Sequence, residues 1–169
     1  MEPVRLRGGR EVRIRPIRGD DAGRLEASHA LLTPDTRYRR FLAAKPRLTE
    51  REVRYLTEVD GHDHYALIAT LAEDPEVIIG VGRFIRHEGD PSAAEFAIVV
   101  GDPYQGKGLG TELIRRLADA AIERDISRFT ATVLADNEPV HRLLRRLAGR
   151  FAEQQRSGSV EELTVDLAA

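Results

Sequence analysis

The chain has 169 residues, about the length of one domain, and its 26 basic and 28 acidic residues leave a formal net charge of −2. It has no cysteine, which excludes disulfides, thiolate metal sites and a cysteine nucleophile. The near-neutral charge provides no basic field, and no window reaches the roughly 18–20 apolar residues of a membrane span, so we expect neither nucleic acid nor a membrane as partner. The N-terminus lacks the apolar region of a secretory signal, which favours a cytoplasmic location.

The first third of the chain predicts one strand and three helices. Apolar and charged residues alternate over 11–17, which is typical of a half-buried strand. Acidic residues at 20–21 favour a helix start, and Thr49 with Glu52 forms a capping-box pattern. The predicted helices cover 20–32, 36–44 and about 50–59.

Three consecutive strands come next, and a crossover follows them. Strands are predicted at 64–71, 77–86 and 94–100, and a long amphipathic helix begins at Leu109. After it we expect a strand at 128–134, a helix at 139–147, and two further strands at 151–155 and 161–167. Meandering strands followed by a strand–helix–strand unit indicate a mixed sheet in an α/β or α+β domain. No linker-like segment divides the chain, so we expect a single domain over residues 1–169.

The most informative segment is IVVGDPYQGKGLGT, residues 98–111, where a strand leads through a glycine-rich turn into a helix. Three glycines there let backbone N–H groups approach a ligand, and the start of a helix favours an anion. Lys107, one of only two lysines in the chain, adds a mobile cation. The spacing fits neither the dinucleotide fingerprint nor the P-loop. The alternative is a turn that only connects a strand to a helix.

The spacing Q-x-x-G-x-G resembles motif A of the GNAT superfamily of acyl-CoA-dependent N-acetyltransferases, through Gln105, Gly108 and Gly110. This resemblance covers nearly the whole chain. It implies a mixed, mostly antiparallel sheet of six to seven strands, splayed in the middle and flanked by four to five helices. It also implies acetyl-CoA as co-substrate, with no metal. Segments 36–41, 56–69 and 94–114 are similar to bacterial Pat-type protein lysine acetyltransferases, which implies an amine acceptor, either a protein lysine or a small molecule. Relatives often form a homodimer.

The same resemblance assigns roles to individual residues. The turn would hold the CoA pyrophosphate, the end of the preceding strand would pair with the pantetheine arm, and Asn137 would contact that arm. The implied cofactor-binding residues are Ile98, Val99, Val100, Gln105, Gly106, Lys107, Gly108, Leu109, Gly110, Thr111 and Asn137. Many relatives carry a tyrosine general acid in the helix after the asparagine. Leu144 occupies that place here, and the usual Gly-Phe ending is altered over 147–151.

Glu95 is the only acid in the apolar run AEFAIVV, and alternation places it on one face with Ala97 and Val99. Partial burial would raise its pKa and suit it to accept a proton from an amine. The resemblance to Pat-type enzymes implies the same role of general base. The alternative is a carboxylate that is salt-bridged to Arg83 or Arg86 on the neighbouring strand. Because the chain has no cysteine, transfer would be direct, within a ternary complex.

His64 is a second candidate base or an orienting partner of Glu95, with a satisfied strand-end histidine as the alternative. The run His62-Asp63-His64 nominates no third ligand, so we expect no metal site. Residues 38–41 either wall the acceptor site or form a solvated helix face. Arg142, Arg145, Arg146 and Arg150 form a basic stripe, which is either solvated or provides one contact to the 3′-phosphate of CoA.

Two other functions compete with acyl transfer. The domain could sense acyl-CoA without turnover, in which case it would bind CoA but release no thiol on any amine. It could instead hold a nucleotide in the same turn, which predicts tighter binding of ATP than of CoA.

Overall fold

The structure, a computed structural model, describes residues 2–148 and 153–167. It contains one sheet in the order β1-β2-β3-β4-β5-β6-β8-β7, in which β5 and β6 are parallel and the other neighbours are antiparallel. The strands are β1 (Val4–Arg5), β2 (Glu11–Pro16), β3 (His64–Leu71), β4 (Ile78–His87), β5 (Asp90–Val100), β6 (Arg128–Leu134), β7 (Glu153–Ser157) and β8 (Val160–Asp166). The mixed, mostly antiparallel sheet is confirmed. It has eight strands rather than six to seven because two-residue β1 adds to the edge.

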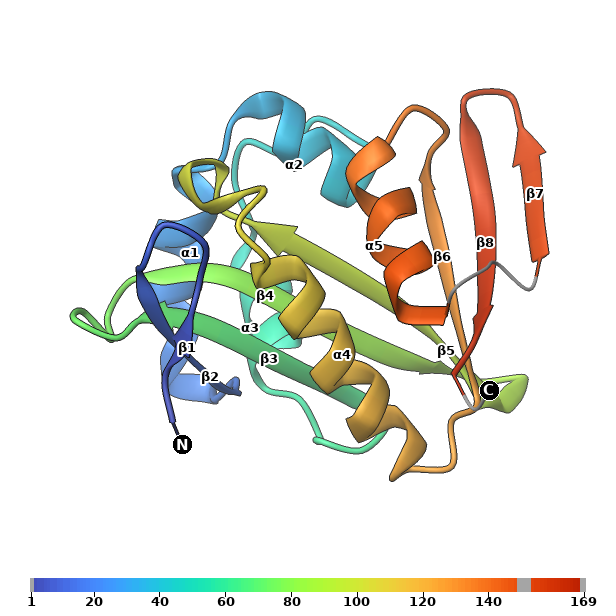
Figure 1. Cartoon of the computed structure of the whole chain (residues 1–169), viewed down its shortest axis with the longest axis horizontal. Helices are drawn as coiled ribbons and strands as arrows, with labels where there is room; N and C mark the ends of the chain where they lie inside the picture. The colour runs from blue at the N-terminus through green and yellow to red at the C-terminus, as the bar shows by residue number, and fades with distance from the viewer. Residues whose placement is uncertain (1, 149–152, 168–169) are drawn as a thin grey trace.

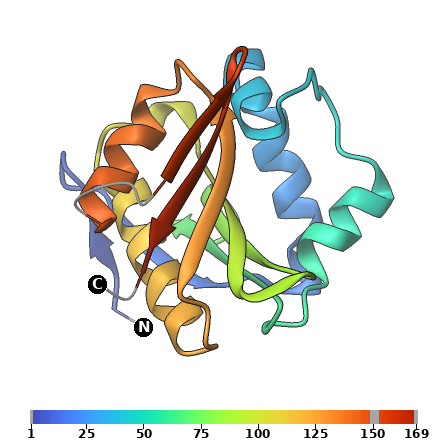
Figure 2. The same ribbon diagram turned by 90° about the vertical axis from the view of Figure 1, so that its right-hand side faces the viewer.

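Helices cover both faces of this sheet. They are α1 (Ala22–Ala30), α2 (Pro34–Phe41), α3 (Glu50–Thr57), α4 (Leu109–Ile122) and α5 (Glu138–Ala148). Figures 1 and 2 show α4 and α5 on one face and α1, α2 and α3 on the other. No helix in the described part of the chain is long and apolar enough to cross a membrane.

Several ends of elements differ from the prediction; β5, for example, begins at Asp90 and not at residue 94. Helix α2 begins at Pro34, capped by the Thr33 side chain, and ends before Leu42, which takes a left-handed φ of 56°. The strand predicted at 151–155 begins outside the described residues at 151–152, and β7 continues to Ser157 before a two-residue turn. The altered ending predicted over 147–151 also lies mostly outside the described residues.

The core lies mainly between α4 and the sheet. Leu109, Leu113 and Leu117 repeat every four residues along α4 and are fully buried. Helix α4 approaches β4 closely because that strand has glycine at two facing positions. A Cβ on Gly82 would lie 2.8 Å from Leu117 Cδ1. A smaller cluster on the opposite face joins α1 and α3 to the sheet through Leu25, Leu56, Ile68 and Val81, among others.

The sheet opens between its two parallel strands. Pairing of β5 with β6 covers only Ala93–Glu95 and Arg128–Thr130, whereas β5 stays paired with β4 as far as Val100. Beyond Glu95 the two strands separate, as Figure 1 shows. This confirms the predicted splay and creates an unpaired strand edge in the middle of the sheet.

Candidate active site

The glycine-rich turn begins at the end of β5 and is braced from α2. Asp102 accepts hydrogen bonds from Thr33 N–H (3.1 Å) and from the hydroxyls of Thr33 (3.1 Å) and Thr36 (2.7 Å). Burial alone would raise the pKa of Asp102, but the hydrogen bonds from Thr36 and Thr33 outweigh it and hold that pKa below its usual value. An ionised Asp102 therefore ties the turn to the start of α2.

The turn itself leaves a row of backbone donors open. Gly106 and Gly108 have φ of +73° and +94°, a region that favours glycine, and a Cβ on either would meet nothing within 4 Å. The Glu112 N–H is the first of α4 to reach a backbone carbonyl, that of Gly108 at 3.1 Å. Within the described ranges, no N–H of residues 106–111 makes a hydrogen bond. These donors at a helix start, with open space before them, can hold an anion.

Side chains of the turn contribute less than its backbone. Leu109 is 1% exposed and belongs to the core, so only its backbone can face a ligand. The Gln105 side-chain amide donates to the Val100 carbonyl (3.0 Å), which fixes the corner between strand and turn. Lys107 and Gln105 are exposed, whereas Gly110 and Thr111 are half-buried on the first turn of α4.

The unpaired edge of β5 exposes the backbone of alternate residues. Ser92 O accepts from Ser127 N–H on the β6 side, and Gly101 N–H donates to Ile79 O on the β4 side. Alternation therefore directs the N–H and C=O groups of Phe96, Ile98 and Val100 into the splay. Two of the three strand residues predicted to bind cofactor, Ile98 and Val100, fit this edge. Val99 does not, because its backbone groups face its register partner Val81 on β4.

Asn137 lies across the splay, after β6. Its Oδ1 accepts from Val140 N–H (3.4 Å) and its carbonyl accepts from His141 Nδ1 (2.7 Å), so it caps α5. The Asn137 side-chain NH₂ makes no hydrogen bond to the described residues. Leu144, at the place of the usual tyrosine, is fully buried in the core. Helix α5 therefore offers no general acid at that position.

Glu95 lies at the base of the splay and lines a pocket of about 250 Å³. Residues of α2, α3, β4 and β5 form its wall: Arg40, Phe41, Glu52, Tyr55, Leu56, Arg83, Ile85, Phe96 and Ala97. Alternation predicted the face of Glu95 correctly, since Ala97 shares the pocket and Val99 packs against the α1–α3 cluster.

Glu95 has neither the partial burial expected of a base nor the salt bridge considered as the alternative. Glu95 is exposed, and its side chain makes no hydrogen bond or ion pair with any described residue. Arg86 Nε instead donates to Asp63 Oδ1 (2.8 Å), and Arg83 forms its bonds elsewhere. The carboxylate is therefore free to receive an incoming group.

His64 lies behind the pocket and does not line it. It is 9% exposed, and its Nε2 accepts a hydrogen bond from Arg83 Nη1 (2.9 Å). Burial first, and then the charge of Arg83, lower the pKa of His64 to about 4, so the imidazole is neutral at pH 7. A neutral ring whose lone pair is occupied is a poor base. The satisfied histidine is therefore the alternative that the structure favours.

Sequence reasoning missed the importance of Arg83, which it considered only as a partner of Glu95. The side chain is almost fully buried, and its Nη1 also donates to the Leu56 carbonyl (2.9 Å). Burial, and then the charge of Arg40, lower the pKa of Arg83 to about 9. An arginine inside the apolar run VIIGVGRFIR was the available signal.

Of the other candidate residues named from the sequence, some line the pocket and others do not. Arg40 and Phe41 line the pocket, whereas Tyr38 is exposed and Arg39 pairs with Asp35 (3.3 Å). His62 bonds Asp63 (2.9 Å), and the described residues contain no group of three or more His, Cys, Asp or Glu side chains placed to hold a metal. Of the basic stripe, Arg142, Arg145 and Arg146 are exposed and Arg150 lies outside the described residues.

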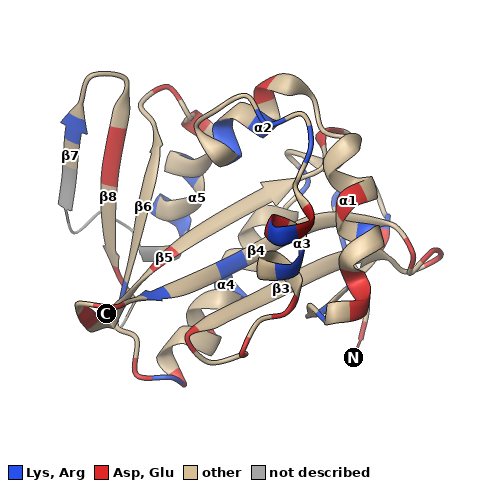
Figure 3. Cartoon of the chain, turned by 180° about the vertical axis from the view of Figure 1, so that it is seen from behind, with Lys and Arg blue, Asp and Glu red and all other residues tan. Residues whose placement is uncertain are grey.

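The sheet beside Glu95 is open on the same face. Figure 3 shows that α1, α2 and α3 leave β8 and most of β6 uncovered there. A second hollow of about 480 Å³ lies on this surface, and its lining includes His87 and Thr130, which hydrogen-bond at 2.8 Å. Because Thr130 is the register partner of Glu95, the pocket adjoins an accessible polar surface.

Comparison with known proteins agrees with this geometry. The acetyltransferase (GNAT) domain family matches residues 11–150. Acetyltransferase Pat of Mycolicibacterium smegmatis is 32% identical over 163 residues, which cover 96% of this chain and 48% of the relative, so the chain spans about half of that protein. The crystal structure of the GNAT domain of S. lividans PAT superposes with a TM-score of 0.87 at 32% identity, covering 98% of this chain and 96% of that one. YncA of Salmonella typhimurium, solved with its cofactor acetyl-CoA, shares the fold at 20% identity, with a TM-score of 0.72 over 94% of this chain and 96% of that one.

Proposed function

Because the chain belongs to the GNAT acetyltransferase family, we propose that it transfers an acetyl or short acyl group from acyl-CoA directly to a primary amine. The acceptor is a protein lysine, as the likeness to Pat suggests, or a small molecule. The observation that carries the proposal is the continuous path from the open glycine turn, along the unpaired edge of β5, to the free carboxylate of Glu95. A homodimer and a cytoplasmic location stay predictions.

The residues present fit acyl-CoA at one end of this path. The free N–H groups of residues 106–111 and the exposed Lys107 would hold the pyrophosphate. The backbone groups of Ile98 and Val100 would pair with the pantetheine arm from one side of the splay, and the Asn137 amide would reach it from the other. Acyl-CoA supplies an activated thioester carbonyl.

Glu95 would act on the acceptor amine, which arrives as an ammonium ion. It accepts one proton, directly or through a water, and the freed nitrogen forms a bond to the thioester carbon. As the carbon–sulfur bond breaks, the nitrogen loses its second proton to water or to the leaving sulfur. Backbone N–H groups at the edge of β5 stabilise the negative charge that develops on the carbonyl oxygen. A thiol has an ordinary pKa of about 8.5, so the sulfur can leave as a thiolate or take a proton from water, without an acid at Leu144.

Replacing Glu95 by glutamine tests this assignment. We expect Glu95→Gln to lower kcat by about 10²–10⁴-fold, the usual contribution of a general base, while the Kd for CoA changes less than about twofold. Thiol release with acetyl-CoA and a panel of amines measures turnover, and calorimetry measures CoA binding. Glu88→Gln, an exposed glutamate outside the pocket, is the matched control.

Unchanged turnover of Glu95→Gln at neutral pH would show that Glu95 is not the base. Binding of CoA by the unaltered protein without thiol release on any amine would instead identify an acyl-CoA sensor.

A further inference from the structure

The pocket beside Glu95 contains two guanidinium groups, those of Arg83 and Arg40, and the charge of Glu95 acts on Arg40 without a direct contact. Glu52 is the other acid of the pocket, and it pairs with Lys45 (2.5 Å) and accepts from Thr49 N–H (3.1 Å). Neither Arg83 nor Arg40 forms an ion pair with a described residue. A buried cation without an anion is strongly disfavoured, so this arrangement needs a reason.

The free edge of Arg83 faces the pocket. Its Nη1 makes both hydrogen bonds, to Leu56 O and His64 Nε2, and these hold the side chain from behind. In the part of the chain that is described, no buried side-chain nitrogen or oxygen lacks a partner. The unbonded Nε and Nη2 of Arg83 are therefore not sealed in the core but open to the pocket that Arg83 lines. Together Nε–H and Nη2–H form the fork that binds a carboxylate through two bonds.

Arg40 adds a second positive charge to the same space. Its guanidinium lies 4.6 Å from the centre of the Phe41 ring, and it is close enough to Arg83 to repel it. Two cations that share a pocket are stabilised by an anion between them.

The anion site and the candidate base are close to each other. Arg83 is the register partner of Ala97, and Ile85 is the partner of Glu95, so Arg83 and Glu95 are diagonal neighbours on one face of the sheet. Such neighbours lie roughly 7–8 Å apart between Cα atoms. One small molecule inside about 250 Å³ can therefore place an amine at Glu95 and an anion at Arg83.

We propose that the acceptor is a free amino acid or a similar small amine whose own carboxylate is bound by Arg83 and Arg40 while Glu95 receives its amino group. This inference rests on the proposed acyl transfer and names the acceptor class. His64 is a positioning residue: as a neutral acceptor it holds Arg83 with its fork towards the pocket. A protein lysine beside an acidic side chain presents the same two groups, and the experiment separates it from the free amino acid.

The test compares acceptors that differ only in the carboxylate. Thiol release is measured with free amino acids, with their primary amides and with the corresponding decarboxylated amines, each rate being corrected for the fraction of unprotonated amine. A lysine peptide with and without a neighbouring aspartate forms a further arm. A charged hydrogen bond predicts at least a tenfold higher kcat/KM for the carboxylate-bearing acceptor. A free amino acid that outperforms both peptides supports the proposal, whereas a preference confined to the acidic peptide overturns the small-molecule acceptor.

Three variants separate recognition from structure. Arg83→Gln is expected to reduce the preference for a carboxylate to within about threefold, mainly through KM for the acidic acceptor. Arg40→Gln, at a half-buried position, should weaken the preference without the folding risk of Arg83. Arg39→Gln, which changes the neighbouring arginine of α2 outside the pocket, is the matched control and should keep the full preference.

Equal kcat/KM for acids and amides in the unaltered protein overturns the inference, as does an equal loss on both in a folded Arg83→Gln protein. If no amine accepts an acetyl group, the proposed function fails, and calorimetry on the CoA-loaded protein decides the anion site separately. Amino-acid binding that depends on Arg83 would support the site, and its absence would overturn it.

Discussion

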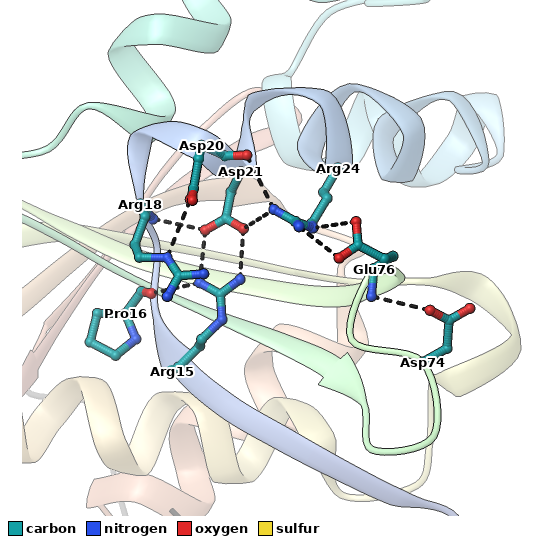
Figure 4. Close-up of polar contacts among 8 residues, drawn as sticks. All are labelled: Arg15, Pro16, Arg18, Asp20, Asp21, Arg24, Asp74 and Glu76. Carbon is teal, nitrogen blue, oxygen red and sulfur yellow. Dashed lines mark hydrogen bonds and ion pairs between the residues drawn. The ribbon is translucent and has the colours of Figure 1, made fainter.

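A buried carboxylate at the start of α1 makes a quantitative prediction about stability. Figure 4 shows Asp21 between two arginines: Arg15 donates two hydrogen bonds (2.8 and 2.6 Å), Arg24 one (3.2 Å) and the Arg18 N–H another (2.8 Å). Arg24 also pairs with Glu76 (2.7 Å), so the cluster joins β2, α1 and the β3–β4 hairpin. We expect Asp21→Asn to disrupt this junction while keeping the shape of the side chain.

The size of the effect follows from burial. Removing one partner of a buried ion pair costs about 3–5 kcal/mol. The side chains of Arg15 and Arg24 are each 25% exposed, whereas that of Asp21 is 0% exposed. Water can therefore solvate the two arginines once Asp21 no longer pairs with them, and we expect a loss at the low end of this range, about 3 kcal/mol. At roughly 2–4 °C per kcal/mol for a chain of this length, the Tm should fall by about 6–12 °C.

The effect should depend on pH in one direction. Burial alone would raise the pKa of Asp21, but the hydrogen bonds from Arg15 and the Arg18 N–H outweigh it and hold that pKa below its usual value. A lowered pKa means that ionised Asp21 stabilises the fold above its unfolded pKa of about 3.9, and that this stability is lost as the pH falls through the folded-state pKa. The difference between the unaltered protein and Asp21→Asn should therefore be full at pH 7 and smaller below about pH 4.

Urea unfolding at pH 7 and pH 3 measures both quantities. The adjacent Asp20 is the matched control, because it is 71% exposed and makes one 3.2 Å contact, with Arg18. Asp20→Asn should change the free energy of unfolding by less than about 0.5 kcal/mol. Equal effects of the two variants, or a loss for Asp21→Asn that is the same at both pH values, would refute the reasoning.

Two glycines give further predictions. Gly82→Ala places a Cβ 2.8 Å from Leu117 Cδ1 and should lower the free energy of unfolding, measured in urea, by about 1–3 kcal/mol. Gly89→Ala serves as the control, because a Cβ there meets nothing within 4 Å. Equal losses in the two variants would contradict close packing of α4 on β4. In Gly108→Ala the new Cβ meets no atom within 4 Å, but an alanine at φ +94° is strained by about 1–2 kcal/mol. We therefore expect calorimetry to find CoA binding about tenfold weaker in this variant. Gly23→Ala, in open space on α1, should leave CoA affinity unchanged, and unchanged affinity in Gly108→Ala would argue against the turn as the cofactor site.

Local signals predicted the elements of this fold well. The capping box of α3 is present as expected, with Glu52 N–H donating to Thr49 Oγ1 and Thr49 N–H donating to Glu52 Oε1, both at 3.1 Å. A cap depends on residues three positions apart, so the sequence contains the whole interaction. The start of α2 was predicted at residue 36, two residues too late, although proline is favoured at the first position of a helix and Pro34 occupies that position.

For the candidate site, the sequence predicted only those features that depend on residues close together along the chain. Gln105, Gly108 and Gly110 lie close together in one turn, so their spacing alone was enough to predict them as cofactor-binding residues. Alternation predicted the face of Glu95 but not its exposure, because exposure depends on how far α2 and α3 extend over the sheet. The bonds of Arg83 to Leu56 and His64 join residues 27 and 19 positions away, so no pattern along the chain could predict them.

The brief pairing of β5 with β6 has a consequence for how the molecule opens. Among the described residues, backbone hydrogen bonding joins the strands β1–β5 to the strands β6–β8 only at the register pairs from Ala93 to Glu95 and at the adjacent bond from Ser127 N–H to Ser92 O. Contacts between α4 and α5 add to that join. Proteins open in cooperative units whose boundaries follow weak joins, so we expect any local opening of this molecule to begin at this seam. A ligand that bridges Val100 and Asn137 would hold the two sides of the seam together, so a cofactor bound in this gap would also stabilise the closed structure.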